Sequence, residues 1–260
     1  MLQNKIIFIT GASSGLGRQL AFDVSRRGAT SVLFARSKEK LDSAKEAIER
    51  NGGVAHVYPL DVSDHNQIPK IINQAIDDVG GVDVLVNNAG YATFELFSES
   101  DMTNNKMMFD VNVLGIMAVT HSVLPTMVSQ GKGHIVNIAS QAGKLSTPKS
   151  SVYAATKHAV LGFTNSLRME LEEKGIHVSA INPGPIRTPF FEQADQSGSY
   201  VKNIERYMLD VEDVSEKIIR LLEKPRRELN LPWWMNIGAT IYQVAPRLLE
   251  KLAGKQFRQK

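Results

Sequence analysis

The sequence alternates short runs of β-branched and aromatic residues with longer amphipathic stretches. The short runs are nearly continuous in Val, Ile, Leu and Phe, which is typical of strands buried on both faces. The expected strands are Lys5–Ile9, Ser31–Ala35, Val54–Pro59, Asp83–Asn87, His134–Ala139 and His177–Ile181. The expected helices are Leu16–Arg27, Lys38–Asn51, His65–Val79, Asp101–Val128, Val152–Lys174 and Val214–Leu222. Such alternation predicts an α/β fold with a doubly wound (Rossmann), three-layer parallel sheet.

The hydrophobic segments recur evenly along the 260 residues, and no linker rich in Pro, Gly or Ser divides them. We therefore expect one domain, with residues 1–232 holding both the nucleotide site and the catalytic site. Residues 233–260 are expected to form an amphipathic, basic C-terminal extension of that same domain.

The chain contains no cysteine, which excludes disulfides and thiolate metal sites. Its six histidines show no His-x-x-x-His spacing, so no metal site is expected. The first residues run directly into the first expected strand, and no apolar run reaches the roughly 20 residues of a membrane-spanning helix. We expect no cleavable signal peptide and a cytoplasmic protein, with peripheral membrane contact by its C-terminal tail as the alternative.

A glycine-rich loop follows the first expected strand and opens the first helix, with the sequence Thr10-Gly11-Ala-Ser-Ser-Gly15-Leu-Gly17-Arg18. Glycines at this place permit a tight turn and close backbone approach to a pyrophosphate. The helix N-terminus adds free N–H groups and the positive end of a dipole. The loop predicts nucleotide binding; the alternative is a glycine-rich turn with no ligand.

Tyr153 and Lys157 lie four residues apart within an expected helix and therefore project from the same face. A cation beside a phenol favours its ionised form, and the unperturbed phenol titrates at about 10, too high for efficient proton transfer near neutral pH. The pair indicates general acid–base chemistry; a packed tyrosine and a solvated lysine are the alternative. Ser140 ends the apolar run His134–Ala139 upstream.

The spacing Gly-x-x-x-Gly-x-Gly, with its preceding threonine, resembles the short-chain dehydrogenase/reductase (SDR) family. Further residues that join the resemblance, in the family's order, are Asp61-Val62, Asn87-Asn-Ala-Gly90, Asn112, Ser140, Tyr153, Lys157 and Asn182-Pro-Gly-Pro-Ile-Arg-Thr188. They extend over about the first three quarters of the chain.

The resemblance implies a catalytic set of Asn112, Ser140, Tyr153 and Lys157. Tyr153 would be the general acid in carbonyl reduction and the general base in alcohol oxidation, and Lys157 would lower its pKa and bond the nicotinamide ribose. Ser140 would hold the substrate oxygen. Asn112 would kink its helix and, with a bound water, continue a proton path from Lys157 to solvent.

The resemblance also implies a dinucleotide cofactor. Its expected contacts are Gly11, Ser13, Ser14, Gly15, Leu16, Gly17, Arg36, Asp61, Val62, Asn88, Gly90, Tyr153, Lys157, Pro183, Ile186 and Thr188. Ala35 stands where an acidic residue would favour NAD, and Arg36 can pair with a 2′-phosphate, so NADP(H) is predicted over NAD(H). Ser13 or Ser14 could add a hydroxyl, although the loop lacks the Lys or Arg of some NADP-using relatives.

Aromatic and aliphatic residues follow the catalytic elements and are candidates to line a substrate pocket: Tyr91, Phe94, Gly143 to Pro148 and Pro189 to Phe191. This mixture favours an apolar carbonyl or alcohol over a sugar phosphate, although the aromatics could equally be core residues. The segment from Phe190 to Asp210 is expected to be a mobile substrate lid.

The C-terminal tail departs from the family pattern of a last strand ending near Val-Asp-Gly-Gly. From Lys224 to Lys260 eight Lys or Arg and two Asp or Glu give +6 within a chain of net charge +3, so the other residues sum to −3. Apolar positions on one expected helical face, which Pro246 would interrupt, are Ile237, Ile241, Val244, Leu248 and Leu252, after Trp233 and Trp234. This face could pack on its own protein, on a sister subunit or on a lipid surface.

No DNA-binding motif is recognised and the tail aromatics are not interleaved with its basic residues, so no nucleic-acid partner is expected. The resemblance implies a homodimer or homotetramer through the expected helices Asp101–Val128 and Val152–Lys174. The sequence thus predicts an NADP(H)-dependent oxidoreductase for a lipophilic carbonyl or secondary alcohol. The alternatives are a catalytically silent dinucleotide-binding regulatory protein and a membrane-bound scaffold; the intact Ser140, Tyr153 and Lys157 argue against a pure sensor.

Overall fold

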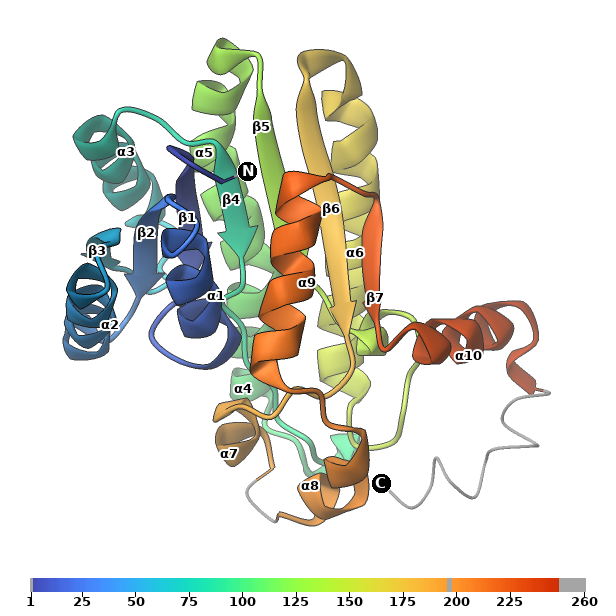
Figure 1. Ribbon diagram of the computed structural model, residues 1–260. Coiled ribbons are helices and arrows are strands. Elements are labelled where there is room, and N and C mark those ends of the chain that lie inside the picture. Colours follow the sequence, from blue (N-terminus) through green and yellow to red (C-terminus); the bar gives the residue numbers. More distant parts are fainter. Residues whose placement is uncertain (1, 196–197, 248–260) are drawn as a thin grey trace.

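The computed structural model describes residues 2–195 and 198–247 and contains a seven-stranded parallel sheet covered by helices on both faces (Figure 1). The strands are β1 (Ile6–Thr10), β2 (Thr30–Ala35), β3 (Val54–Pro59), β4 (Val84–Asn87), β5 (Gly133–Ile138), β6 (Ile176–Pro183) and β7 (Glu228–Leu231). They lie in the order β3-β2-β1-β4-β5-β6-β7. The predicted doubly wound fold is confirmed.

Helices lie between successive strands along the chain, and α10 follows the last strand. They are α1 (Gly15–Ser25), α2 (Lys38–Arg50), α3 (Ile68–Val79), α4 (Met102–Phe109), α5 (Ile116–Gln130), α6 (Ser151–Leu171), α7 (Phe190–Ala194), α8 (Ser199–Ile204), α9 (Val211–Glu223) and α10 (Trp233–Val244). The start of α3 was predicted three residues too early, at His65, because Pro69 is what marks the first helical turn.

Alternate residues of each strand face opposite sides of the sheet, and both sides are buried. Ile7 and Ile9 of β1 pack with α1, α2 and α9, whereas Phe8 between them packs with α3, α5 and α6. This two-sided burial explains why the strand sequences are continuous apolar runs.

The strand β7 was not predicted. It has only four residues, and polar Glu228 and Asn230 alternate with Leu229 and Leu231, which is a weak signal for a strand. Its parallel pairing with β6, from Ala180↔Glu228 to Pro183↔Leu231, makes it the edge of the sheet.

The single helix expected at Asp101–Val128 is instead three consecutive segments. A π-helical segment, Asp110–Gly115, separates α4 from α5 and holds Asn112. Together Met102–Gln130 spans 29 residues and includes an 18-residue window with a mean hydropathy of 1.5, which by length and composition alone is enough to cross a bilayer. We interpret it as a core helix, because Val119, Val123 and Met127 of α5 pack in the interior beside the sheet.

The strand order reverses between β1 and β4, and there the glycine loop after β1 lies beside the Asn87–Gly90 loop after β4. Ligands of doubly wound sheets bind at this point. The helices α7 and α8 lie beyond the carboxyl ends of the strands (Figure 1), where the lid was expected. That this segment moves remains a prediction.

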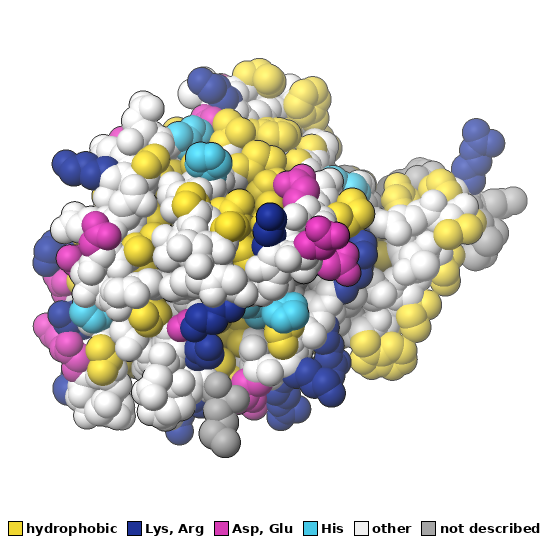
Figure 2. Space-filling model, turned by 90° about the horizontal axis from the view of Figure 1, so that it is seen from above, with side chains coloured by type: hydrophobic (Ala, Val, Ile, Leu, Met, Phe, Trp, Pro, Cys, Tyr) yellow, Lys and Arg dark blue, Asp and Glu magenta, His cyan; other side chains and the backbone are white. Residues whose placement is uncertain are grey.

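The C-terminal helix α10 begins at Trp233 and ends at Val244, before Pro246, as the sequence indicated. It projects from the body of the protein after β7 (Figure 1) and stands at the right of the view down the sheet in Figure 2. Leu248 and Leu252 lie outside the described residues.

Candidate active site

The glycine loop has no room for larger side chains. Gly11 has φ +65°, and a Cβ there would lie 2.8 Å from the Cα of Ala89. A Cβ on Gly17 would lie 2.5 Å from both Asn88 Nδ2 and the carbonyl oxygen of Gly11. Asn88 Nδ2 donates to the carbonyl oxygens of Thr10 (3.0 Å) and Gly11 (3.2 Å). The amide of Asn88 therefore fixes the shape of a backbone cradle that only glycines can form.

The first turn of α1 opens toward this cradle. Ser14 is the exposed N-cap residue and makes no side-chain capping bond, Ser13 is half-buried, and Leu16 is buried and anchors the turn in the core. A Cβ on Gly15 would lie 3.2 Å from Thr188 Cβ, so the loop after β6 meets the glycine loop here. Uncapped N–H groups beside a close backbone approach fit a pyrophosphate.

The ends of β2 and β3 border the same side of the site. The backbone N–H of Ala12 donates to the carbonyl oxygen of Phe34 at 3.2 Å, which holds the glycine loop against the end of β2. Arg36 follows, exposed, and forms no ion pair within the described chain. Asp61 Oδ1 accepts from both the N–H and the hydroxyl of Ser63, and Val62 beside it is buried.

The loop after β6 carries the remaining predicted cofactor residues. Pro183 ends the strand in the core, and the N–H of Gly184 donates to the carbonyl oxygen of Leu231 at 2.6 Å. Ile186 forms an isolated parallel bridge with Leu209, and Thr188 Oγ1 donates to the Ile186 carbonyl oxygen at 3.4 Å. Thr188 reaches the glycine loop, so the structure brings the two halves of the predicted cofactor site together.

Tyr153 and Lys157 lie one turn apart on α6, at the carboxyl end of β5. Lys157 is 5% exposed, its Nζ lies 5.7 Å from the centroid of the Tyr153 ring, and it donates to the carbonyl oxygen of Ile138 at 2.8 Å. Burial lowers the pKa of Lys157 to about 8. The ammonium is thus held beside the phenol by the carbonyl oxygen of Ile138, which lies two residues before Ser140.

Ser140 caps the short turn after β5. Its Oγ accepts from the N–H of Ala142 at 3.0 Å and donates to the carbonyl oxygen of Pro183 at 3.4 Å. A Cβ on Gly143 would lie 2.7 Å from the carbonyl oxygen of Lys157, so this turn packs directly on α6. The turn that carries Ser140 and the helix that carries Tyr153 and Lys157 therefore form one packed unit.

Asn112 holds this unit to the loop after β4. Its Oδ1 accepts from the N–H of Tyr91 (3.0 Å), and its Nδ2 donates to the Tyr91 carbonyl oxygen (2.8 Å) and to Thr156 Oγ1 (3.2 Å). A Cβ on Gly90 would lie 3.0 Å from Asn112 Oδ1 and 3.8 Å from Lys157 Nζ. The side chain of Asn112 thus positions the backbone around Lys157, from a π-helical segment of the kind often found at functional sites.

Three phenylalanines gather around Tyr153. The ring centroid of Phe94 lies 5.7 Å and that of Phe190 6.2 Å from the centroid of Tyr153, and Phe191 stacks on Phe94 at 6.1 Å. These residues come from the segments after β4 and β6 that were candidates to line the pocket. The phenol therefore lies in largely apolar surroundings.

Sequence reasoning missed a polar cluster beneath this site. Lys144, within the range assigned to the pocket, donates instead to Glu228 of β7 and to Asn236 of α10 (3.1 Å). Glu228 also accepts from Asn182 Nδ2 at 3.2 Å. Burial raises the pKa of Glu228, but the opposing hydrogen bonds and charge, led by Lys144, hold it below its ordinary value. No local motif marks contacts between residues this far apart in the chain.

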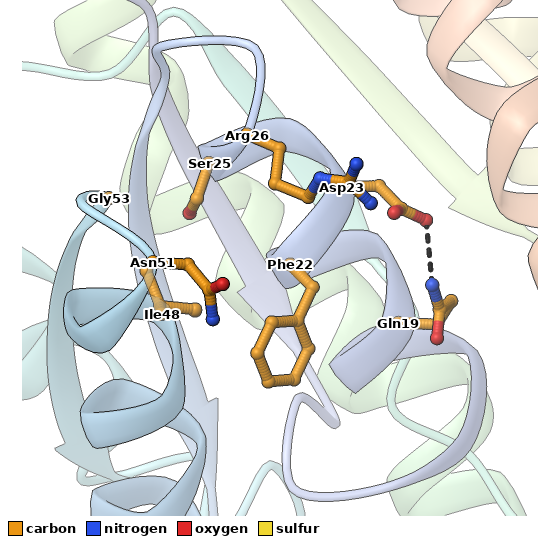
Figure 3. Close-up of a pocket in the computed structure, with 8 residues that line it drawn as sticks. All are labelled: Gln19, Phe22, Asp23, Ser25, Arg26, Ile48, Asn51 and Gly53. Carbon is orange, nitrogen blue, oxygen red and sulfur yellow. Dashed lines mark hydrogen bonds between the residues drawn. The ribbon is translucent and has the colours of Figure 1, made fainter.

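A separate cavity of about 330 Å³ lies between α1 and α2 (Figure 3). Phe22, Asp23 and Arg26 of the α1 side and Asn51 and Gly53 after α2 line it. Gly53 precedes β3, so this cavity belongs to the amino ends of the strands, away from the glycine loop. It contributes nothing to the candidate active site.

Comparisons with known proteins show the family of the chain. The family profile described as short chain dehydrogenase matches residues 5–198. An uncharacterized oxidoreductase of Staphylococcus saprophyticus is 34% identical over 225 residues, which cover 86% of this chain and 93% of that protein. A short chain dehydrogenase/reductase from Burkholderia phymatum, solved in complex with NAD, is 25% identical with a TM-score of 0.88 over 95% of both chains. A variant of actinorhodin polyketide ketoreductase, solved with NADPH, is 28% identical with a TM-score of 0.80 over 89% of this chain and 97% of that one.

The matched segment contains the glycine loop, Asn112, Ser140, Tyr153 and Lys157, and the relatives span nearly the whole sheet. The chain belongs to the short-chain dehydrogenase/reductase family of oxidoreductases.

Proposed function

We propose that this protein uses NADP(H) to interconvert a lipophilic carbonyl and the corresponding alcohol, with Tyr153 as the proton donor. The observation that carries the proposal is the buried ammonium of Lys157 beside the Tyr153 ring, one turn away on α6. When bound in the glycine cradle, the nicotinamide would supply or accept the hydride.

The proton chemistry follows from this pair. A fixed cation close to a phenol favours the phenolate, so Tyr153 would release its proton to a developing alkoxide more readily than a free phenol. In the reverse direction the same phenolate would take the proton of an alcohol. Lys157 is held for this role by the Ile138 carbonyl oxygen.

Ser140 would orient the substrate oxygen. Its hydroxyl bond to Pro183 is long at 3.4 Å, so the O–H can turn to a stronger acceptor as negative charge develops on a carbonyl oxygen. The N–H of Ala142, in the same turn, donates to this Oγ and holds it in place.

The aromatic surroundings of Tyr153 support an apolar substrate. Phe94, Phe190 and Phe191 offer apolar surface next to the reacting group and no charge to recognise a sugar phosphate. The structural relative that is named a polyketide ketoreductase fits a ketone as the reacting group.

Arg36 supports NADP(H) as the cofactor. It stands directly after β2, exposed and without an ion-pair partner among the described residues, while Ala35 leaves no carboxylate to accept from a ribose hydroxyl. An arginine at this place can bind a 2′-phosphate in a bidentate manner. Solved relatives hold NAD in one case and NADPH in another, so this residue carries the choice.

We also propose that the protein assembles as a homodimer or homotetramer through the helices between β4 and β6. Large apolar side chains are exposed along these helices, namely Met102, Met107, Phe109, Leu114, Val128 and Met169. Exposed apolar residues in such number mark an interaction surface.

The test is a panel of aliphatic and aromatic ketones and aldehydes, assayed by oxidation of NADPH and of NADH, with wild type and Tyr153→Phe. The variant lacks the proton donor but keeps the ring, so we expect turnover to fall by about 10² to 10⁴ while the melting temperature stays near that of wild type. Tyr58→Phe on β3, which removes only the hydrogen bond from the Tyr58 hydroxyl to Asp78 of α3, is the matched control and should keep full activity. Near wild-type turnover in Tyr153→Phe would refute the mechanism.

A further inference from the structure

The C-terminal helix α10 has an apolar face that no described residue covers. The exposed fractions of Trp233, Ile237, Ile241 and Val244 are 71%, 51%, 43% and 82%, and their spacing places them on one side of the helix. The segment Trp233–Val244 contains no charged residue at all. Apolar surface of this extent on a helix marks an interaction site. We propose that this face docks α10 in the headgroup region of an anionic lipid bilayer.

The other side of α10 is fixed to the catalytic domain. Ala239 is fully buried, Asn236 accepts from Lys144 of the turn after Ser140, and a Cβ on Gly184 would lie 2.9 Å from Met235 Sδ. These contacts set the direction of the apolar face. The docking surface is therefore part of the folded protein at the active-site end of the sheet, where β7 leads into it (Figure 1).

The charges near α10 favour an anionic surface. The Arg206 guanidinium stacks on Tyr207 at 4.6 Å, Tyr207 contacts the ring of Trp234 at 6.1 Å, and exposed Arg247 follows the helix. The sequence beyond the described residues continues with four further cations and one acidic residue, namely Lys251, Lys255, Arg258, Lys260 and Glu250. Cationic residues close to an apolar helix strengthen its binding to anionic lipids.

The strand β7 separates the basic residues of the tail into two groups, of which only one lies near α10. Lys224, Arg226 and Arg227 precede β7, whose four residues extend about 13 Å, so they lie at its opposite end from α10. The cations that favour docking are therefore Arg206, beside the exposed acidic Glu205, and Arg247, and the sequence of residues 248–260 adds a net +3.

Among the possible occupants, a bilayer fits better than a second copy of this face. A second copy of α10 carries no acidic side chain that could neutralise the nearby cations, whereas an anionic surface neutralises them. With 12 residues the helix is roughly 18 Å long, too short to span a bilayer but suited to lie in its plane. The tryptophans suit that depth, because their rings combine an apolar body with a polar N–H.

The experiment uses the intrinsic fluorescence of the full chain, because its only two tryptophans are Trp233 and Trp234. The protein is titrated with vesicles of phosphatidylglycerol and phosphatidylcholine, and with vesicles of phosphatidylcholine alone. We expect a blue shift with the anionic vesicles, quenching by brominated acyl chains, and weaker binding at high salt. The double variant Ile237→Ser/Val244→Ser should partition about tenfold less, since both side chains lose their apolar contact with lipid.

The matched control is Val54→Ser on β3, a side chain 52% exposed at the far edge of the sheet, which should bind vesicles as wild type does. Reduction of a soluble ketone should be equal in all these proteins, which separates loss of docking from loss of the proposed activity. A blue shift that depends on protein concentration without vesicles would identify a second copy as the occupant and overturn the proposal. An emission spectrum that changes in neither titration would overturn it too.

Discussion

The ammonium of Lys157 is buried beside Tyr153, the proposed proton donor. Its only hydrogen bond to a described group is that to the Ile138 carbonyl oxygen, and burial lowers its pKa from 10.5 to about 8. Between these two values the unfolded chain binds the proton and the folded chain does not. Stability must therefore rise with pH across this window.

We predict that the free energy of unfolding of wild type gains about 2 kcal/mol relative to Lys157→Met between pH 8 and pH 10. Urea titrations at several pH values measure it. The series stops at pH 10 because burial and Asp78 raise the pKa of Tyr58, whose effect above that pH has the opposite sign. If the free energies of unfolding of the two proteins changed equally with pH, the lowered pKa of buried Lys157 would be contradicted.

The choice of cofactor is proposed to depend on one guanidinium, that of Arg36. We predict that Arg36→Leu weakens NADPH affinity by about 10- to 100-fold, the value of a charge-assisted bidentate contact, and leaves NADH affinity unchanged. Lys38→Leu is the control, since the Lys38 ammonium is already engaged by Asp42 at 2.6 Å. Calorimetric titration of both cofactors measures it, and equal losses for NADPH and NADH would argue against a phosphate contact.

At the scale of elements, the glycine loop and α1 act together. We predict that Gly17→Ala weakens dinucleotide binding at least tenfold and lowers the melting temperature, because its Cβ would displace Asn88 from the loop. Gly162→Ala on α6 is a matched control, since no atom lies within 4 Å of its Cβ position. There the change should raise stability by about 1 kcal/mol. Equal effects of Gly17→Ala and Gly162→Ala would show that helix propensity, and not the contact with Asn88, causes the changes.

Six strands could be predicted because two-sided burial leaves continuous apolar runs in the sequence. β7 could not, because its Glu228 and Asn230 are tolerated only through partners on other elements, such as Lys144 and Asn182. The local sequence around Asn112 does not reveal the π-helical segment, since it is as helical as its flanks, and only the family resemblance implied a kink there. Such elements form because of tertiary contacts, and these contacts leave no pattern in the local sequence.

Some residues of the candidate site could likewise be predicted from the sequence, and others could not. Gly11, Tyr153 and Lys157 could be named because their spacing follows from one loop or one helical turn. Thr156, which accepts from Asn112 and donates to the Tyr153 carbonyl oxygen, could not, because its role depends on a contact 44 residues away in the sequence.

At the scale of the whole molecule, the exposed apolar residues between β4 and β6 imply assembly. We predict that Phe109→Lys/Leu114→Lys shifts the protein from dimer or tetramer to monomer, because each charge would be buried unpaired at an interface. Size-exclusion chromatography with light scattering measures it, with Val54→Lys on the far edge strand as control. A monomeric wild type would rule out the assembly proposal.

The two tryptophans of this chain both lie on α10, outside the sheet and its two packed faces. Their emission therefore follows the detachment of one peripheral helix and is nearly blind to the seven strands. A thermal melt recorded by fluorescence and one recorded by far-ultraviolet circular dichroism would coincide only if α10 and the sheet unfold as one cooperative unit. The gap between the two curves is a direct measure of how tightly the C-terminal helix is coupled to the catalytic domain.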